Sequence, residues 1–508
     1  MIKQIQRILG RSKQKIHRRL DSMPRGDLGH PVMTASNIQY DCSTKTSAIN
    51  AGGIGAIHLM ARRSGLIESI DNHVSVLKYH LPYHESDHVL NVAYNLLSGG
   101  QALDDIELRR QDEVYLDALG AVTIPDPTTE GDFCRRFDEA SNWALMNAIN
   151  EARLKIWRQQ PAEFFQQKAR IDADGTQVVT LGECKEGMDI SHKGEWGYHP
   201  LLLSLANTNE SLFLLNRSGN RPSHEGAPEL FDRSAKLCRE AGFREILFRG
   251  DTDFSLTRYF DRWDEEGNKF VFGLDAHKKV VDRAVQIEDD EYFELVRHGE
   301  RALKTAPRRK PENVKEQIIK ERGYLNRKLD FEQYTEFDYK PLKCEKTYRV
   351  VVLQKNITAE RGELALFDEI KYFFYITNDR QMSAEEVIRE SNQRCNQENL
   401  ISQLKNGVRA LRAPVNTLNA NWAYMIMASL AWNLKAWMAL SLPVSPRWAE
   451  KHEKEKASLL KMEFRKFLNV IMLQPCQIIK TGRKIVYRLL AWNPWQPVFF
   501  RFVNALRL

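Results

Sequence analysis

At 508 residues the chain is too long for one ordinary hydrophobic core, so we expect two or three domains. A hydrophobic fraction of 43% and a charged fraction of 28% fit a soluble globular protein. The formal net charge of +7, from 74 basic and 67 acidic side chains, favours a nucleic-acid partner only weakly.

Cysteine usage and hydropathy exclude several classes of protein. The seven cysteines are scattered and form no Cys-x-x-Cys pair, which argues against a disulfide framework or a zinc site and for a reducing interior. The most apolar stretch, from Trp422 to Leu442, is interrupted by Asn433 and Lys435, which indicates a buried core helix rather than a membrane span. We therefore expect a cytoplasmic protein that does not enter membranes.

The first segment of the chain is basic. Residues 1–30 hold eight lysines and arginines against Asp21 and Asp27. Apolar residues at helical spacing, such as Ile5 and Leu9, predict a basic helix over residues 2–20, inside an N-terminal arm of residues 1–50. Such a helix either lies on DNA phosphates or is simply solvated, and the pattern leaves both alternatives open.

Residues 51–165 show helical periodicity with short loops, which predicts a small all-helical domain. Gly99-Gly100 marks one turn, and the spacing of Thr129 and Asp132 predicts a helix start. Small helical domains often bind DNA, so we interpret this region as a DNA-binding domain, with a helical scaffold as the alternative.

From about residue 169 the periodicity becomes that of strands. Residues 170–176, 201–205 and 212–215 are short apolar runs separated by turns, and a helical segment at 229–241 precedes a strand at 244–248. Strands that first meander and then alternate with helices predict a mixed α/β sheet covered by helices, of which residues 166–276 form the first part. Asp174 lies in the first strand, and Asp251 comes just after the strand at 244–248.

Residues 277–380 interrupt this rhythm and predict a mainly β insertion. Strand-like alternation occurs at 348–353 and 372–377, after a charged stretch in which residues 300–328 hold ten lysines and arginines against four glutamates. Within it, Arg308, Arg309 and Lys310 are candidate DNA contacts. A solvated loop is the competing interpretation.

A helix over residues 381–410 is predicted to complete the sheet domain. Arg394, Glu398 and Lys405 stand four and then seven residues apart in it, offsets that place a carboxylate between two cations on one helical face. The remaining residues, 411–508, are predicted to be helical and to serve DNA end contact or dimerisation. Trp422, Trp432 and Trp437 fit core or subunit packing better than base stacking.

Asp174, Asp251 and Glu398 form the main candidate site. Carboxylates from two strands and a helix can hold a pair of divalent cations, an arrangement that suits in-line attack on a phosphodiester. Taken singly, an aspartate at a strand end is usually a turn or cap residue, and a glutamate between cations is usually a surface ion pair. Asp172 and Asp253, two residues from the presumed ligands, are alternative ligands.

These residues resemble a known family. Asp174-Gly-Thr176 looks like an Asp-x-Thr start, Arg249-Gly-Asp251-x-x-Phe254 like an Arg-x-Asp-Ser-Gly-Phe segment, and Arg394-x3-Glu398-x6-Lys405 like a tyrosine-arginine-glutamate-lysine signature. Together they are similar to the DDE transposases of bacterial insertion sequences, with the group-one DDE domain of the "thirteen-eighty" family. Residues 197–201, 217–220 and 372–378 add to the resemblance, which covers about residues 50–440.

The resemblance implies an RNase H-like mixed sheet with flanking helices, interrupted by the β insertion. Two positions depart from the family pattern. Ser391 stands where the signature tyrosine is expected, which puts any positioning role of that tyrosine in doubt. Asp253 stands where the motif has glycine.

The implied activity is that of a transposase acting on the terminal inverted repeats of its own element. Two Mg²⁺ ions, for which Mn²⁺ can substitute, would be held by Asp174, Asp251 and Glu398 for strand cleavage and strand transfer, while Arg394 and Lys405 contact phosphates. The implied partners are double-stranded terminal and target DNA and a second copy of the chain, in the bacterial cytoplasm and at the nucleoid. The alternatives are a metal-dependent nuclease or resolvase without strand transfer, and a catalytically silent DNA-binding descendant.

Overall fold

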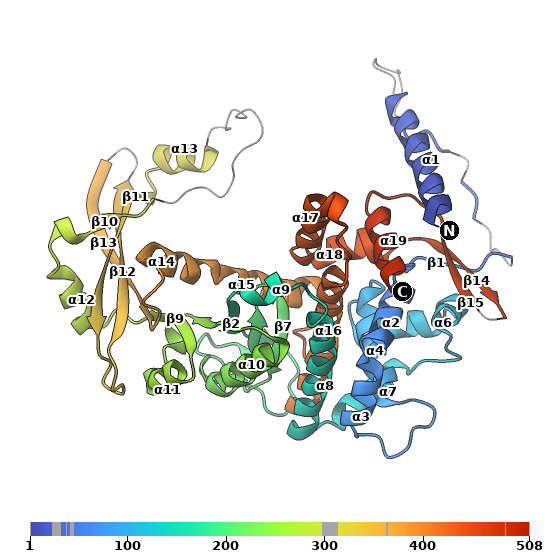
Figure 1. Ribbon diagram of the computed structural model, residues 1–508, viewed down its shortest axis with the longest axis horizontal. Coiled ribbons are helices and arrows are strands. Elements are labelled where there is room, and N and C mark those ends of the chain that lie inside the picture. Colours follow the sequence, from blue (N-terminus) through green and yellow to red (C-terminus); the bar gives the residue numbers. More distant parts are fainter. Residues whose placement is uncertain are drawn as a thin grey trace.

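The computed structural model describes residues 2–22, 32–36, 38–40, 45–296, 313–361, 364–482 and 484–506 (Figure 1). Its centre is a mixed sheet with the strand order β10-β11-β12-β13-β9-β8-β2-β6-β7. Helices cover the central strands, so the expected mixed α/β class is confirmed.

Five adjacent strands, ending at the edge strand β7, form one half of this sheet: β2 (Ala169–Gly175), β6 (Leu201–Leu205), β7 (Glu210–Leu215), β8 (Ile246–Gly250) and β9 (Asn268–Leu274). β6 pairs antiparallel with both β2 and β7, whereas β8 runs parallel to β2 and β9 parallel to β8. All five residues of β6 and of β8 are buried, because helices cover both faces of the sheet here.

Long antiparallel strands extend the sheet beyond β9. They are β11 (Leu325–Tyr339), β12 (Tyr348–Arg361) and β13 (Leu364–Thr377), with the short β10 (Phe293–Glu294) at the edge. β13 pairs with β9, so the ribbon continues the central sheet (Figure 1, left). The described residues of 277–380 are therefore rich in strand, as expected, but the strands are longer than the alternation predicted. α12 (Lys278–Val285) precedes β10, and α13 (Val314–Glu321) lies between β10 and β11.

The range 51–165 contains only helices: α2 (Ile54–Arg63), α3 (Leu66–His73), α4 (Glu85–Leu97), α5 (Ile106–Arg110), α6 (Glu113–Leu119), α7 (Pro127–Arg135), α8 (Glu139–Trp157) and α9 (Ala162–Gln166), with one 3-10 turn. The predicted start at Thr129 is two residues late. The Asp126 carboxylate accepts the backbone N–H groups of Thr128 and Thr129 at 2.9 and 3.0 Å, so α7 begins at Pro127.

The C-terminal region is not purely helical, and that expectation is wrong for residues 476–489. There β14 (Cys476–Thr481) and β15 (Lys484–Leu489) form a hairpin that pairs with β1 (Ala48–Ile49). The helices of this region are α16 (Leu418–Leu440), α17 (Ala449–Leu460), α18 (Phe464–Phe467) and α19 (Gln496–Ala505). None of the helices within the described ranges has the length and apolarity needed to cross a membrane.

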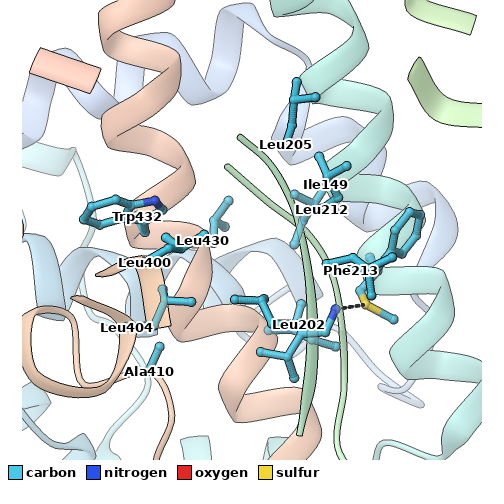
Figure 2. Close-up of a cluster of buried hydrophobic side chains, with 14 of the residues drawn as sticks. Ile149, Leu202, Leu205, Leu212, Phe213, Leu400, Leu404, Ala410, Leu430 and Trp432 are labelled. Atoms are coloured by element: carbon cyan, nitrogen blue, oxygen red, sulfur yellow. Dashed lines mark hydrogen bonds between the residues drawn. The ribbon is translucent and has the colours of Figure 1, made fainter. Parts of the chain in front are cut away.

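The hydrophobic core fixes the sheet between α8 and the helices that follow β13. The apolar stretch from Trp422 to Leu442 is buried almost throughout, in α16 and the turn after it, as its composition predicted. In Figure 2, Ile149 of α8 lies on one side of β6 and β7, while Leu400 and Leu404 lie on the other. This packing holds the segment that contains Glu398 against the sheet.

Candidate active site

Asp174 and Asp251 lie at the same edge of the sheet because they belong to neighbouring parallel strands. Asp172 of β2 is opposite Arg249 of β8 in the strand register. Asp174 and Asp251 each come two residues later, and neighbouring strands are about 4.8 Å apart. Asp174 is the penultimate residue of β2, and Asp251 directly follows β8. The register therefore brings the two aspartates side by side.

Glu398 reaches the same edge through α15 (Cys395–Ser402), which packs against β2. Gln397 is the anchor, with a side chain that is only 1% exposed. Its amide nitrogen donates to the carbonyl of Leu202 at 3.1 Å, and its amide oxygen accepts the hydroxyl of Ser204. Both partners lie on β6, where Leu202 is paired with Asp174. These bonds fix the helix beside the strand that carries Asp174.

The electrostatics of Asp174 show that the three carboxylates share one region. Burial raises the pKa of Asp174 to about 7; Arg394 opposes that shift, while the negative charges of Asp251 and Glu398 add to it. Burial also raises the pKa of Asp251, again against Arg394. Carboxylates arranged in this way repel one another, and a cation between them would relieve the repulsion.

Arg394 supplies positive charge to this acidic region. Its Nη1 atom lies 4.0 Å from Oδ2 of Asp251, and its side chain is only 16% exposed. Lys405 lies nearby as well: burial lowers the pKa of its ammonium group, and the carboxylates of Glu195 and Asp174 oppose that shift. Both cations thus lie near Asp174, and Arg394 also lies beside Asp251.

The single regular helix predicted for residues 381–410 is wrong. α14 (Ala384–Gln393) ends before Arg394, α15 follows, and residues 403–407 form a π-helical turn that contains Lys405. Ser391, at the signature tyrosine position, lies in the last turn of α14, where its carbonyl accepts the N–H of Arg394 at 3.2 Å. The junction and the π-turn, rather than ideal helical offsets, direct Arg394 and Lys405 toward the acids.

Asp172 forms a buried ion pair with Arg249. It is 1% exposed and accepts Nε and Nη2 of Arg249 at 2.6 and 2.8 Å. Arg249 also donates to Glu390 of α14 at 2.7 Å, and Glu390 accepts a further pair of bonds from Arg170. This buried network connects β2, β8 and α14. Sequence reasoning missed it, although the position of Arg249 two residues before Asp251 was the available signal.

Asp253 lies beside Asp251 and adds negative charge to the site. It is exposed, its backbone N–H donates to Oδ1 of Asp251 at 3.1 Å, and its carboxylate contributes to the raised pKa of Asp251. Arg308, Arg309 and Lys310, the candidate DNA contacts, lie outside the described residues, and their role stays a prediction.

Three carboxylates are the donor set that hard divalent cations such as Mg²⁺ prefer, so the chemistry of the site fits a metal. Their spacing is not that of a closed ligand set: among the described residues, no group of three or more His, Cys, Asp or Glu side chains is arranged to hold an ion. The acids face one region, with Arg394 among them.

Known proteins provide two points of comparison. The family model described as transposase DDE domain group 1 matches residues 33–508. A cryo-EM structure of a piggyBac transposase synaptic complex with hairpin DNA is similar with a TM-score of 0.38 and 10% sequence identity, over 83% of this chain and 82% of that chain. No curated protein matches the chain.

Proposed function

Because the chain belongs to the family of transposases with a group 1 DDE domain, we propose that it cleaves and joins DNA at the ends of an insertion sequence. Strand topology supports an RNase H-like core: β7, β6 and β2 are antiparallel neighbours, and β8 and β9 continue parallel to β2. In this proposal the long strands β11, β12 and β13 are an insertion between the last core strand and the helix that carries Glu398.

The observation that carries the proposal is the approach of Asp174, Asp251 and Glu398, from β2, the end of β8 and α15. These side chains would hold two Mg²⁺ ions, for which Mn²⁺ can substitute. When bound, the ions supply Lewis-acid activation of the attacking oxygen and stabilise the leaving oxygen. Asp174, whose raised pKa reflects burial, provides a ligand shielded from bulk water.

Arg394 and Lys405 would hold the DNA. Each is a partly buried cation near the acids, so a phosphate that approaches the site meets positive charge there. The two cations orient the scissile phosphate, while Gln397 and the network of Asp172, Arg249 and Glu390 keep the supporting elements in place. Holding the phosphate and the attacking group in a fixed geometry accelerates phosphodiester cleavage, because less entropy is lost on the way to the transition state.

The remaining parts of the chain take supporting roles in this proposal. The arm of residues 1–50 and the helices of residues 51–165 bind the terminal inverted repeats. Residues 166–276 and 381–410 form the catalytic core around the insertion at 277–380, and residues 411–508 contact the DNA end or a second copy of the chain. Joining two ends in one complex calls for a homodimer on double-stranded DNA.

One incubation separates this function from its alternatives. Purified protein is mixed with Mg²⁺ and labelled element ends, and the products are resolved on a denaturing gel. A transposase gives joined products, a nuclease or resolvase gives cuts alone, and a silent descendant gives only a shifted band on a native gel. A Glu398→Gln variant in the same assay controls for a contaminating nuclease, because only cleavage by this chain depends on Glu398.

A further inference from the structure

A groove far from the carboxylates lies between α1 (Ile2–Asp21) and the C-terminal region. It encloses about 1010 Å³ and is lined by Leu9, Lys13 and His17 of α1 on one wall and by Trp448, Phe500 and Arg501 on the other. In Figure 1, α1 projects from the body of the protein above α19 and the hairpin of β14 and β15. The helix packs against α19, and Phe500 and Arg501 of α19 line the groove.

The groove combines cations with aromatic faces. Lys13 belongs to one wall and Lys451 and Arg501 to the other, while Trp448 offers a ring that is 54% exposed. The acid that lines the groove, Glu455, already accepts Nη1 of Arg501 at 2.8 Å and lies 3.8 Å from Nζ of Lys451. Positive charge therefore exceeds negative charge along the walls.

Two further observations concern positive charge that lacks a partner. Within the described residues, Nε and Nη2 of Arg501 are buried and have no hydrogen-bond partner, while its Nη1 donates to Glu455. The cations of α1 whose side chains are described likewise have no ion-pair partner in the described part of the chain; they are Arg7, Arg11, Lys13, Lys15, Arg18 and Arg19. Of these cations Lys13 lines the groove, so the wall formed by α1 presents an unpaired positive charge to an occupant.

We propose that this groove binds a single-stranded segment of nucleic acid, with bases stacked on Trp448 and Phe500 and phosphates on Lys13, Lys451 and Arg501. Unpaired bases can stack on aromatic rings that line a groove, whereas the bases of a duplex are already stacked on each other and only its phosphates would contact the groove wall. The volume is at the upper end of ligand pockets, which span about 300–1,000 Å³, and gives room for a short unpaired stretch. The inference rests on the proposed function, because strand cutting is what leaves unpaired ends near the protein.

The test is a binding measurement without divalent metal, which separates it from catalysis. A short fluorescein-labelled oligothymidine is titrated with the full-length protein at low salt, and anisotropy reports the affinity. Trp448→Ala is expected to weaken binding about tenfold or more, and Trp448→Phe to restore most of it, because stacking needs only an aromatic face. Trp448 is exposed, so neither variant disturbs the core.

One lysine variant and one arginine variant show which face of α1 the nucleic acid contacts. Residues two apart project about 200° apart on a helix, so Arg11 faces away from the groove that Lys13 lines. Lys13→Ala is expected to lower the oligothymidine affinity several-fold and to flatten its salt dependence, with Arg11→Ala close to wild type.

Three results would each overturn the proposal. The first is an unchanged oligothymidine affinity in Trp448→Ala, and the second is an equal loss of affinity in Lys13→Ala and Arg11→Ala. The third is an equal effect of Trp448→Ala on the binding of a duplex of the same length. None of these results bears on Mg²⁺-dependent cleavage of element ends, which is measured separately.

Discussion

Replacing Arg394 by glutamine should strengthen the binding of divalent cations to the DNA-free protein. In the structure the guanidinium of Arg394 occupies the acidic region, 4.0 Å from the Asp251 carboxylate. An incoming metal ion must compete with this positive charge, and glutamine removes the competitor while it retains most of the side-chain volume.

The magnitude follows from the geometry. Two unit charges 4.0 Å apart attract by about 4 kcal/mol at an effective dielectric constant of about 20. Because Asp251 is 38% exposed, solvent screening reduces this to about 1–2 kcal/mol. Metal affinity should therefore rise about 5- to 30-fold in Arg394→Gln.

The assay titrates Mn²⁺ into the DNA-free protein at constant pH and follows the free ion by its paramagnetic resonance signal. Arg389→Gln is the matched control: it removes an arginine of α14 that is 60% exposed and pairs with Glu386. Its affinity should equal that of the wild type. An unchanged or weaker affinity in Arg394→Gln would refute the view that the guanidinium competes with the metal. The same variant should cleave DNA more slowly, because a phosphate contact is lost.

Two further predictions concern stability. Burial lowers the pKa of Lys435 to about 7 from an ordinary value of 10.5. Above about pH 7 the unfolded chain therefore binds a proton that the folded chain lacks. The free energy of unfolding should then rise with pH by about 1.4 kcal/mol per pH unit, relative to that of Lys435→Met. Urea unfolding of both proteins near pH 7 and near pH 9 measures this, and parallel pH profiles would contradict it. Arg249→Met leaves the buried carboxylates of Asp172 and Glu390 without their shared partner and should destabilise the fold by about 3–5 kcal/mol. The control Arg233→Met, in an exposed pair with Glu229, should change stability by less than about 1 kcal/mol, and similar losses in both variants would contradict the special role of Arg249.

Much of the fold was predictable because local patterns and tertiary packing agree. The apolar run before Asp251 is a fully buried core strand, and such strands show as hydrophobic segments without polar alternation. The apolar stretch after Trp422 behaves in the same way as a buried helix. For both, the hydrophobic pattern alone indicated a buried element.

Other features depend on contacts that no local pattern reports. The break at Arg394 and the π-turn at Lys405 arise where the chain packs against the sheet, so helical periodicity alone predicted one regular helix. The hairpin of β14 and β15 pairs with β1, more than four hundred residues earlier in the chain, although Gly482 between two alternating runs was a usable turn signal. The ion pair of Asp172 and Arg249 likewise joins separate strands, and only the parallel register reveals it.

The central claim is that Asp174, Asp251 and Glu398 act together on a phosphodiester. The most direct test measures strand cleavage and end binding side by side for Asp174→Asn, Asp251→Asn and Glu398→Gln, with labelled element ends and Mg²⁺. Each variant is expected to bind ends with nearly wild-type affinity and to yield no cleaved strand. Wild-type cleavage by any one of the three would show that its carboxylate lies outside the reacting centre.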